Sequence, residues 1–265
     1  RFYAMSWTTC IERHDTVDST MRVAATLADR GAREGTTVVA RAQTAGRGRH
    51  GRRWHSPTGA GLWLTTIVRP HPGTPAHLAT LSLVGGIAAW RALRALGVAD
   101  VRVKWPNDLV VHARKLGGVL LEMRPDVERA PCVLIGMGIN VAARAALSLP
   151  DDVSPLYVGL VDCLRKDGSG PDALLEQTLC TLLPELEACY HRWQAEGLAD
   201  VLAEWQEADA LAGVRVRIDD GAQTRVGIAD GISAHGELRV RIGGQTVLVG
   251  AGEVVQVRGR EEDCQ

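Results

Sequence analysis

The sequence has few aromatic residues, no cysteine pairs at metal-binding spacing and no uninterrupted apolar run of membrane length. One Phe and three Tyr occur among 265 residues, which leaves few side chains for stacking on nucleic-acid bases. None of the six Cys forms a C-x-x-C pair, so neither a zinc site nor a redox motif is indicated. The longest apolar stretch, Leu78–Trp90, contains Thr80 and Ser82 and falls short of the ~20 residues of a membrane span.

Acidic residues are absent from one long segment. Between Gly35 and Ala99 there is no Asp or Glu, although the net charge of the whole chain is −1. The arginines of this segment are Arg41, Arg47, Arg49, Arg52, Arg53, Arg69, Arg91 and Arg94. Positive charge without opposing acids favours an anionic small ligand, such as a phosphate or a carboxylate. A solvated basic face is the alternative interpretation.

No targeting segment is recognisable at the start of the sequence. The residues RFYAMSW do not form a charged region followed by an apolar one, so no signal peptide is predicted. A chain of this size does not need disulfides to fold, and its hydrophobic and charged content is typical of soluble enzymes. We therefore expect a soluble, cytoplasmic protein with free thiols and no membrane partner.

Hydrophobic periodicity predicts a large α+β region followed by a small β region. The predicted helices are 21–32, 75–96, 172–193 and 198–211, and Pro184 is expected to kink or restart the third. The predicted strands are 36–42, 61–69, 101–105, 115–123 and 132–141. After Gly213, short alternating segments separated by Asp-Gly, His-Gly and Gly-Gly are typical of a small barrel. These patterns predict one domain over residues 1–211 and a second over residues 212–265.

The densest chemical signal is the segment QTAGRGRHGRRW, which spans Gln43–Trp54. It contains a G-x-G-x-x-G pattern, but a dinucleotide site needs a helix directly afterwards and an acidic residue about 20 positions later. Here a strand is predicted next and no acid precedes Asp100, so the Rossmann interpretation is rejected. Arginine binds carboxylates and phosphates bidentately, and glycine lets the backbone approach a ligand closely. The loop therefore suits a carboxylate held beside a triphosphate, with a nucleic-acid-binding arm as the rival interpretation.

Five sequence blocks together resemble the biotin–protein ligase family, in the form without an N-terminal DNA-binding domain. They occur in the family's order and cover essentially the whole chain. The blocks are Asp18-Ser19-Thr20, the loop from Gln43 to Arg52, KWPND at Lys104–Asp108, KLGGVL at Lys115–Leu120 and GMGINV at Gly136–Val141.

The resemblance implies an α+β fold of the class II synthetase-like biotin/lipoate ligase type. A mixed β-sheet with helices on one side would form the biotin- and ATP-binding catalytic domain, and residues 212–265 would form an SH3-like barrel. Only about 17 residues precede the first block, which is short for a DNA-binding domain, so no DNA binding is expected. Lipoate–protein ligase, which shares the fold and chemistry, is the close alternative. A basic nucleic-acid-binding module is the more distant one.

The resemblance also implies a two-step reaction. Biotin and ATP, with Mg²⁺, would give biotinyl-5′-AMP, and biotin would then pass to a lysine of a biotin carboxyl carrier protein belonging to acetyl-CoA carboxylase or a related carboxylase. A homodimer is left open. No metal site made by the protein alone is predicted, although Asp108 is a candidate to hold Mg²⁺ together with the phosphates.

The resemblance assigns roles to individual residues in three groups. The predicted catalytic residues are Lys115 and Arg47. The predicted biotin-binding residues are Ser19, Thr20, Gln43, Arg47, Gly48, Arg49 and Lys115. The predicted ATP-binding residues are Arg49, Trp54, Asn107, Asp108 and Asn140. At position 21 the family usually has Asn, whereas Met21 stands here, so a polar contact from this position is doubtful.

Overall fold

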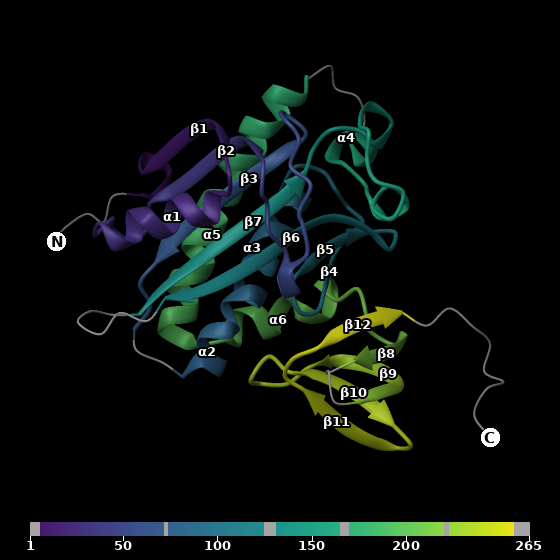
Figure 1. Cartoon of the computed structure of the whole chain (residues 1–265). Coiled ribbons are helices and arrows are strands. Elements are labelled where there is room, and N and C mark those ends of the chain that lie inside the picture. The colour runs from purple at the N-terminus through teal and green to yellow at the C-terminus, as the bar shows by residue number, and fades with distance from the viewer. Residues whose placement is uncertain (1–5, 72–73, 125–130, 165–169, 220–222, 257–265) are drawn as a thin grey trace.

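A computed structural model describes residues 6–71, 74–124, 131–164, 170–219 and 223–256, which form two sheets (Figure 1). The large sheet has seven strands in the order β1-β2-β3-β7-β6-β5-β4. Its strands are β1 (Ile11–Val17), β2 (Thr37–Gln43), β3 (Gly61–Val68), β4 (Val101–Lys104), β5 (Asp108–Val111), β6 (Arg114–Arg124) and β7 (Cys132–Asn140). Strand β1 runs parallel to β2, and the other neighbouring pairs among the described residues are antiparallel. The sheet is therefore mixed, as predicted.

Helices cover both faces of the large sheet, so the prediction that they lie on one side is wrong. Helix α1 packs on one face, and α3 and α5 pack on the other. The alternation of side chains along a strand explains this, because neighbouring Val38 and Val39 belong to different core clusters, one under α1 and one under α3 and α5. The helices are α1 (Thr20–Asp29), α2 (Pro75–Ala79), α3 (Leu81–Ala95), α4 (Leu160–Cys163), α5 (Pro171–Glu196) and α6 (Ala199–Ala208).

Three local predictions from the sequence differ from the structure. The helix predicted over 75–96 is divided at Thr80 into α2 and α3. Helix α5 passes through Pro184 without ending, so the predicted restart does not occur. Strands β1 and β5 were not predicted, because the first has polar residues at most positions and the second, DLVV, does not alternate between apolar and polar residues.

The most apolar helical segment lies inside the molecule. Residues Pro75–Ala95 are long and apolar enough to cross a membrane by length and composition alone. Most of this segment, however, is buried within the fold. Helix α3 contacts β4, β5, β6 and β7 on one side and α5 on the other. Such a central position explains why most residues of this helix are apolar.

The small sheet comprises five antiparallel strands in the order β11-β10-β9-β8-β12, compatible with the predicted SH3-like fold. Its strands are β8 (Arg215–Asp219), β9 (Thr224–Ile232), β10 (Leu238–Ile242), β11 (Gln245–Val249) and β12 (Glu253–Gln256). Helix α6 contacts both β4 and β9, so it joins the two sheets. The indole N–H of Trp105 also donates to the carbonyl of Gly236 at 2.9 Å. The domain boundary at residues 211 and 212 stays a prediction.

Candidate active site

The loop that joins β2 to β3 folds back on itself as a narrow hairpin. The N–H of Gly48 donates to the carbonyl of Arg52 at 2.7 Å, and the N–H of Trp54 donates to that of Gly46 at 2.9 Å. A Cβ atom on Gly46 would lie 2.5 Å from the carbonyl oxygen of Trp54, so this approach of two backbones requires glycine. A short 3-10 turn, Arg49–Gly51, forms the tip of the hairpin.

A cluster of neutral polar side chains lies at the base of this loop. The amide oxygen of Gln43 accepts hydrogen bonds from the N–H of Thr20 at 2.9 Å and from its hydroxyl at 3.2 Å. The amide nitrogen of Gln43 donates to Ser56 Oγ at 2.9 Å. The hydroxyl of Thr65 in β3 donates to Thr20 Oγ1 at 2.9 Å. Neighbouring Ser19 is buried and precedes α1, and its hydroxyl makes no capping hydrogen bond.

A second cluster combines one ammonium group, one carboxylate and one indole. Lys115 Nζ lies 2.7 Å from Asp108 Oδ1 and 5.0 Å from the centroid of the Trp54 ring. The indole of Trp54 packs on the backbone of β7, because a Cβ atom on Gly138 would lie 2.8 Å from Trp54 Cε2. It also meets Trp63 edge to face, with centroids 6.4 Å apart. The ammonium thus has two partners that can stabilise a cation.

Two arginines of the loop bind different partners. Arg49 donates to the amide oxygen of Asn107 at 3.2 Å, and the amide nitrogen of Asn107 donates to the carbonyl of Val119 at 2.8 Å. Arg47 instead pairs with Glu122 of β6 at 3.4 Å. Arg49 therefore lies beside the KWPND segment, whereas Arg47 does not contact the Lys115 cluster.

Asn140, at the end of β7, is buried and bound to the backbone. Its amide nitrogen donates to the carbonyl of Lys115 at 3.0 Å and to that of Val158 at 3.3 Å. Nearby, the hydroxyl of Tyr157 donates to the carbonyl of Ala142 at 2.8 Å. Burial raises the pKa of Tyr157, so this hydroxyl keeps the proton that it donates.

The structure therefore brings most of the predicted site residues into two connected clusters. Trp54 links them, because the hydroxyl of Ser56 donates to its carbonyl at 3.3 Å while its ring lies under the Lys115 ammonium. The residues brought together are Thr20, Gln43, Arg49, Trp54, Asn107, Asp108 and Lys115. Ser19 precedes Thr20 in the chain, and Gly48 pairs with Arg52 within the loop hairpin. Arg47 pairs with Glu122, and Asn140 binds the backbone of Lys115.

Sequence reasoning missed several residues of this region. Ser56 and Thr65 complete the neutral cluster, Glu122 binds Arg47, and Gly138 supports Trp54. Thr65 could have been noticed as a polar residue within an otherwise apolar strand, since buried hydroxyls need a partner. Met21, in contrast, belongs to the apolar cluster under α1 and its methyl group covers Gly136, so it offers no polar contact.

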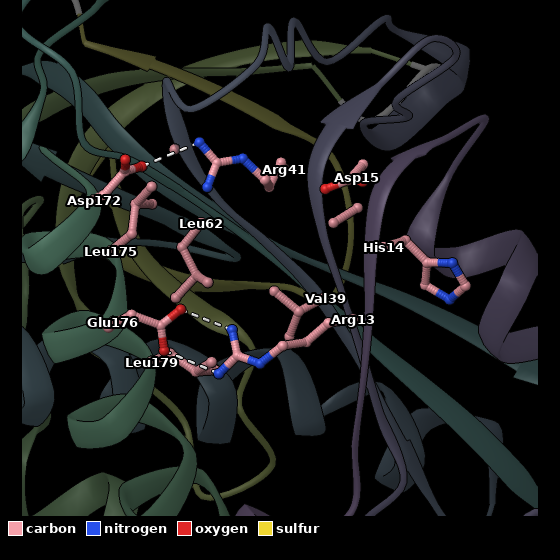
Figure 2. Close-up of a pocket in the computed structure, with 12 residues that line it drawn as sticks. Arg13, His14, Asp15, Val39, Arg41, Leu62, Asp172, Leu175, Glu176 and Leu179 are labelled. Carbon is pink, nitrogen blue, oxygen red and sulfur yellow. Dashed lines mark hydrogen bonds and ion pairs between the residues drawn. The ribbon is translucent and has the colours of Figure 1, made fainter.

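A cavity of about 370 Å³ lies elsewhere, between β1, β2, β3 and α5 (Figure 2). Its floor is apolar and includes Val39 and Leu62, which belong to the core under α5. The side chains of Arg13 and Arg41 reach across it to Glu176 and Asp172 of α5. None of the predicted site residues lines this cavity. It lies on the face of the sheet opposite to α1, so it is separate from the two clusters.

Among the residues that the structure describes, no group of three or more His, Cys, Asp or Glu side chains is arranged to hold a metal ion. Asp108 is the carboxylate beside Lys115. One carboxylate together with phosphate oxygens is a common way for proteins to hold Mg²⁺, so this donor set fits a nucleotide-bound ion.

Comparison with known proteins identifies related sequences. Residues 14–140 match the Biotin/lipoate A/B protein ligase family. The chain is 34% identical, over 85% of its length, to the Biotin--[acetyl-CoA-carboxylase] ligase of Mycobacterium tuberculosis, of which it covers 80%. It is 39% identical, over 78% of its length, to the Bifunctional ligase/repressor BirA of Escherichia coli K12. It spans 61% of that longer relative.

A solved structure shows the same fold over nearly the whole chain. The biotin protein ligase from Aquifex aeolicus in complex with biotin and ATP is similar to this chain with a TM-score of 0.78 at 25% identity, covering 94% of this chain and 99% of that one. The predicted fold class is thereby confirmed. The chain belongs to the biotin/lipoate protein ligase family.

Proposed function

We propose that this chain is an ATP-dependent biotin–protein ligase. It forms biotinyl-5′-AMP and pyrophosphate from biotin and ATP, then transfers biotin to a lysine of a biotin carboxyl carrier protein. The observation that carries the proposal is the arrangement around Trp54, with a neutral hydrogen-bonding cluster on one side and the Lys115 ammonium on the other. Biotin has matching ends, a neutral ureido ring and a carboxylate.

The neutral cluster supplies what a ureido ring requires. That ring has one carbonyl acceptor and two N–H donors, and hydroxyl and amide groups satisfy both without burying a charge. Ser19, Thr20 and Gln43 are the proposed ligands, with Ser56 and Thr65 fixing the orientation of Gln43 and Thr20. When biotin binds, hydrogen bonds to the ligand would replace some of the hydrogen bonds within the cluster. Its buried polar atoms would therefore keep hydrogen-bond partners.

Lys115 is the proposed catalytic residue of the first step. A carboxylate oxygen of biotin attacks the α-phosphorus of ATP, the bond to the bridging oxygen of pyrophosphate breaks, and pyrophosphate carries away the electron pair. Both reactants are anions, so the lysine ammonium and the guanidinium groups of Arg47 and Arg49 offset the repulsion and the charge that develops at phosphorus. The backbone of Gly48 leaves room for the ligand. Positioning and charge neutralisation are sufficient, since no covalent enzyme intermediate is needed.

The nucleotide is assigned to the Lys115 side of the site, against the indole of Trp54. An indole face can stack on adenine, and Asn107, Asp108 and Asn140 are the proposed polar contacts. Asp108 would hold Mg²⁺ with the phosphate oxygens, and the bound ion would neutralise part of the triphosphate charge. Asp108 Oδ1 lies 2.7 Å from Lys115 Nζ. The proposed phosphate position is therefore close to both groups.

In the second step, the lysine amine of the carrier protein attacks the acyl carbon of biotinyl-5′-AMP. The amide bond forms, the acyl–phosphate bond breaks, and AMP leaves with the electron pair while the amine loses a proton. A soluble carrier domain of a carboxylase is the proposed acceptor, in the cytoplasm. The lipoate alternative is not favoured, because the relatives named above are biotin ligases.

The function is tested by acceptor mass. The purified chain is incubated with biotin, MgATP and a carboxylase carrier domain, and we expect the carrier to gain the mass of one biotinyl group. Lys115→Ala should abolish the gain. Arg41→Ala is the matched control, because Arg41 makes an exposed ion pair on the opposite face of the sheet, and it should retain activity. No mass gain with the wild-type chain, or full activity of Lys115→Ala, would contradict the proposal.

A further inference from the structure

An irregularity in the sheet determines where Lys115 points. Strand β6 pairs with β5 so that Gly117 lies opposite Leu109 and Lys115 lies opposite Val110, which leaves Leu116 as an extra residue. Such a β-bulge changes the direction of the side chains that follow it. Because of the bulge, the side chain of Lys115 does not point to the face that regular alternation along the strand would give it.

The burial of the neighbouring residues shows the effect of this bulge. Val119 packs in the core under α3 and α5, and a Cβ atom on Gly117 would contact core residues Leu109 and Ile139. Strict alternation would turn Leu116 toward the active-site face and Lys115 into the core.

The bulge reverses this outcome. Leu116 is fully buried in the same core. Lys115 instead reaches Asp108 and lies beside Gly118 on the active-site face. The site therefore has its ammonium only while the bulge is maintained.

The backbone at the bulge is held by the side chain of Asn140. Pairing between β6 and β7 ends at Gly117 opposite Ile139, so Lys115 lies beyond that ladder. Its carbonyl accepts hydrogen bonds from Asn140 Nδ2 at 3.0 Å and from the N–H of Val158 at 3.1 Å. Asn140 Nδ2 also donates to the carbonyl of Val158 at 3.3 Å. One buried amide thus connects the strand that carries Lys115 to the segment beside it.

We propose that Asn140 is a positioning residue for Lys115, which it aims by fixing the bulged backbone. This goes beyond the nucleotide contact expected for Asn140, and it rests on the proposed catalytic role of Lys115. Both amide hydrogens of Asn140 are directed to backbone carbonyls in the structure. Loss of Asn140 removes one of the two hydrogen bonds to the carbonyl of Lys115 and so loosens this backbone. Loss of a nucleotide contact would weaken ATP binding instead.

The kinetic test compares Asn140→Ala with Tyr157→Phe. The control removes one buried hydrogen bond from the same region, donated to Ala142, and leaves the carbonyl of Lys115 bonded. Because small displacements of a positioned group lower rates by up to roughly 100-fold, we expect kcat for pyrophosphate release to fall about 10- to 100-fold in Asn140→Ala. KM for ATP should rise by a smaller factor, through loss of the proposed nucleotide contact, and Tyr157→Phe should stay near wild type. A raised KM for ATP with unchanged kcat would overturn the proposal.

A spectroscopic test needs no substrate. The chain contains only three lysines, Lys104, Lys115 and Lys166, so ¹³Cε-lysine labelling gives a simple NMR spectrum in which Lys115→Ala identifies its signal. Asn140→Ala should move that signal and leave the other two in place, and Tyr157→Phe should move none. An unmoved Lys115 signal would refute the positioning role.

Two further outcomes are distinguishable. If Asn140→Ala does not fold, Asn140→Ser, which keeps one polar side-chain group, is measured by the same criterion. If the wild-type chain forms no adenylate, the proposed function fails, while the NMR comparison still decides whether Asn140 fixes Lys115.

Discussion

Three glycines beneath the active site give a graded prediction, because the structure specifies what each added methyl group would meet. A Cβ atom on Gly117 would lie 2.6 Å from the carbonyl oxygen of Gly138, which is backbone of the adjacent strand. One on Gly138 would lie 2.8 to 2.9 Å from three indole atoms of Trp54. One on Gly136 would lie 2.6 Å from the terminal methyl group of Met21. Contacts below 3.0 Å are essentially never observed for real Cβ atoms, so each neighbour must move.

The ease of that movement sets the magnitude. Overpacking costs about 1–3 kcal/mol; we assign the upper end to Gly117→Ala, since a paired strand cannot shift alone. Trp54 is on a loop and can tilt, so Gly138→Ala should cost about 1–2 kcal/mol. Met21 has a flexible tip, and the entropy gain of about 0.4–1 kcal/mol from replacing Gly offsets most of the cost, so Gly136→Ala should be nearly neutral.

Thermal unfolding measures the order directly. For a chain of this size, 1 kcal/mol corresponds to a Tm change of about 2–4 °C, so Tm should fall most for Gly117→Ala, less for Gly138→Ala and hardly at all for Gly136→Ala. Gly138→Ala should also raise KM for ATP, because it displaces the proposed adenine platform. Equal Tm losses in the three variants, or an unchanged KM for ATP in Gly138→Ala, would refute the reasoning.

Three other predictions concern single residues. Arg47→Ala should weaken biotin binding about 10- to 100-fold, the usual range for a charge-assisted hydrogen bond; an unchanged calorimetric affinity would exclude the role. Arg91→Met should destabilise the fold by about 2 kcal/mol in urea unfolding, because it leaves the half-buried carboxylate of Glu204 without its cation; an unchanged midpoint would show that the pair contributes nothing. Burial, with a smaller contribution from Asp162, raises the pKa of Cys163 to about 11, so little of this thiol is thiolate at pH 8. Iodoacetamide should therefore modify Cys163 much more slowly than exposed Cys180. Equal modification rates would contradict this.

The sequence was sufficient to predict the main helices, most strands and the candidate site residues. Apolar periodicity predicts buried elements such as β3 and α3. The family blocks predict Thr20, Gln43 and Lys115 as site residues, and the structure places all three in the two clusters. Edge strand β1 was missed, since an edge strand with exposed polar side chains has no apolar alternation to detect.

Other features depend on tertiary contacts that no local pattern encodes. The packing of the Trp54 indole against Gly138 brings together residues that lie far apart in the chain. The bulge at Leu116 reverses the facing of Lys115 through pairing with β5. The pairing of Arg47 with Glu122 likewise follows from how the loop folds over β6. The sequence therefore predicts several residues that the structure places in the two clusters, but not the partners of Arg47 and Asn140.

In the proposed function, the region between the neutral cluster and Lys115 joins biotin to AMP. The most direct measurement supplies the purified chain with biotin and α-labelled MgATP in the absence of any acceptor, and then separates the nucleotides bound to the protein. We expect near-stoichiometric biotinyl-5′-AMP on the wild-type chain and none on Lys115→Ala. Bound ATP and biotin without any acyl nucleotide would contradict it.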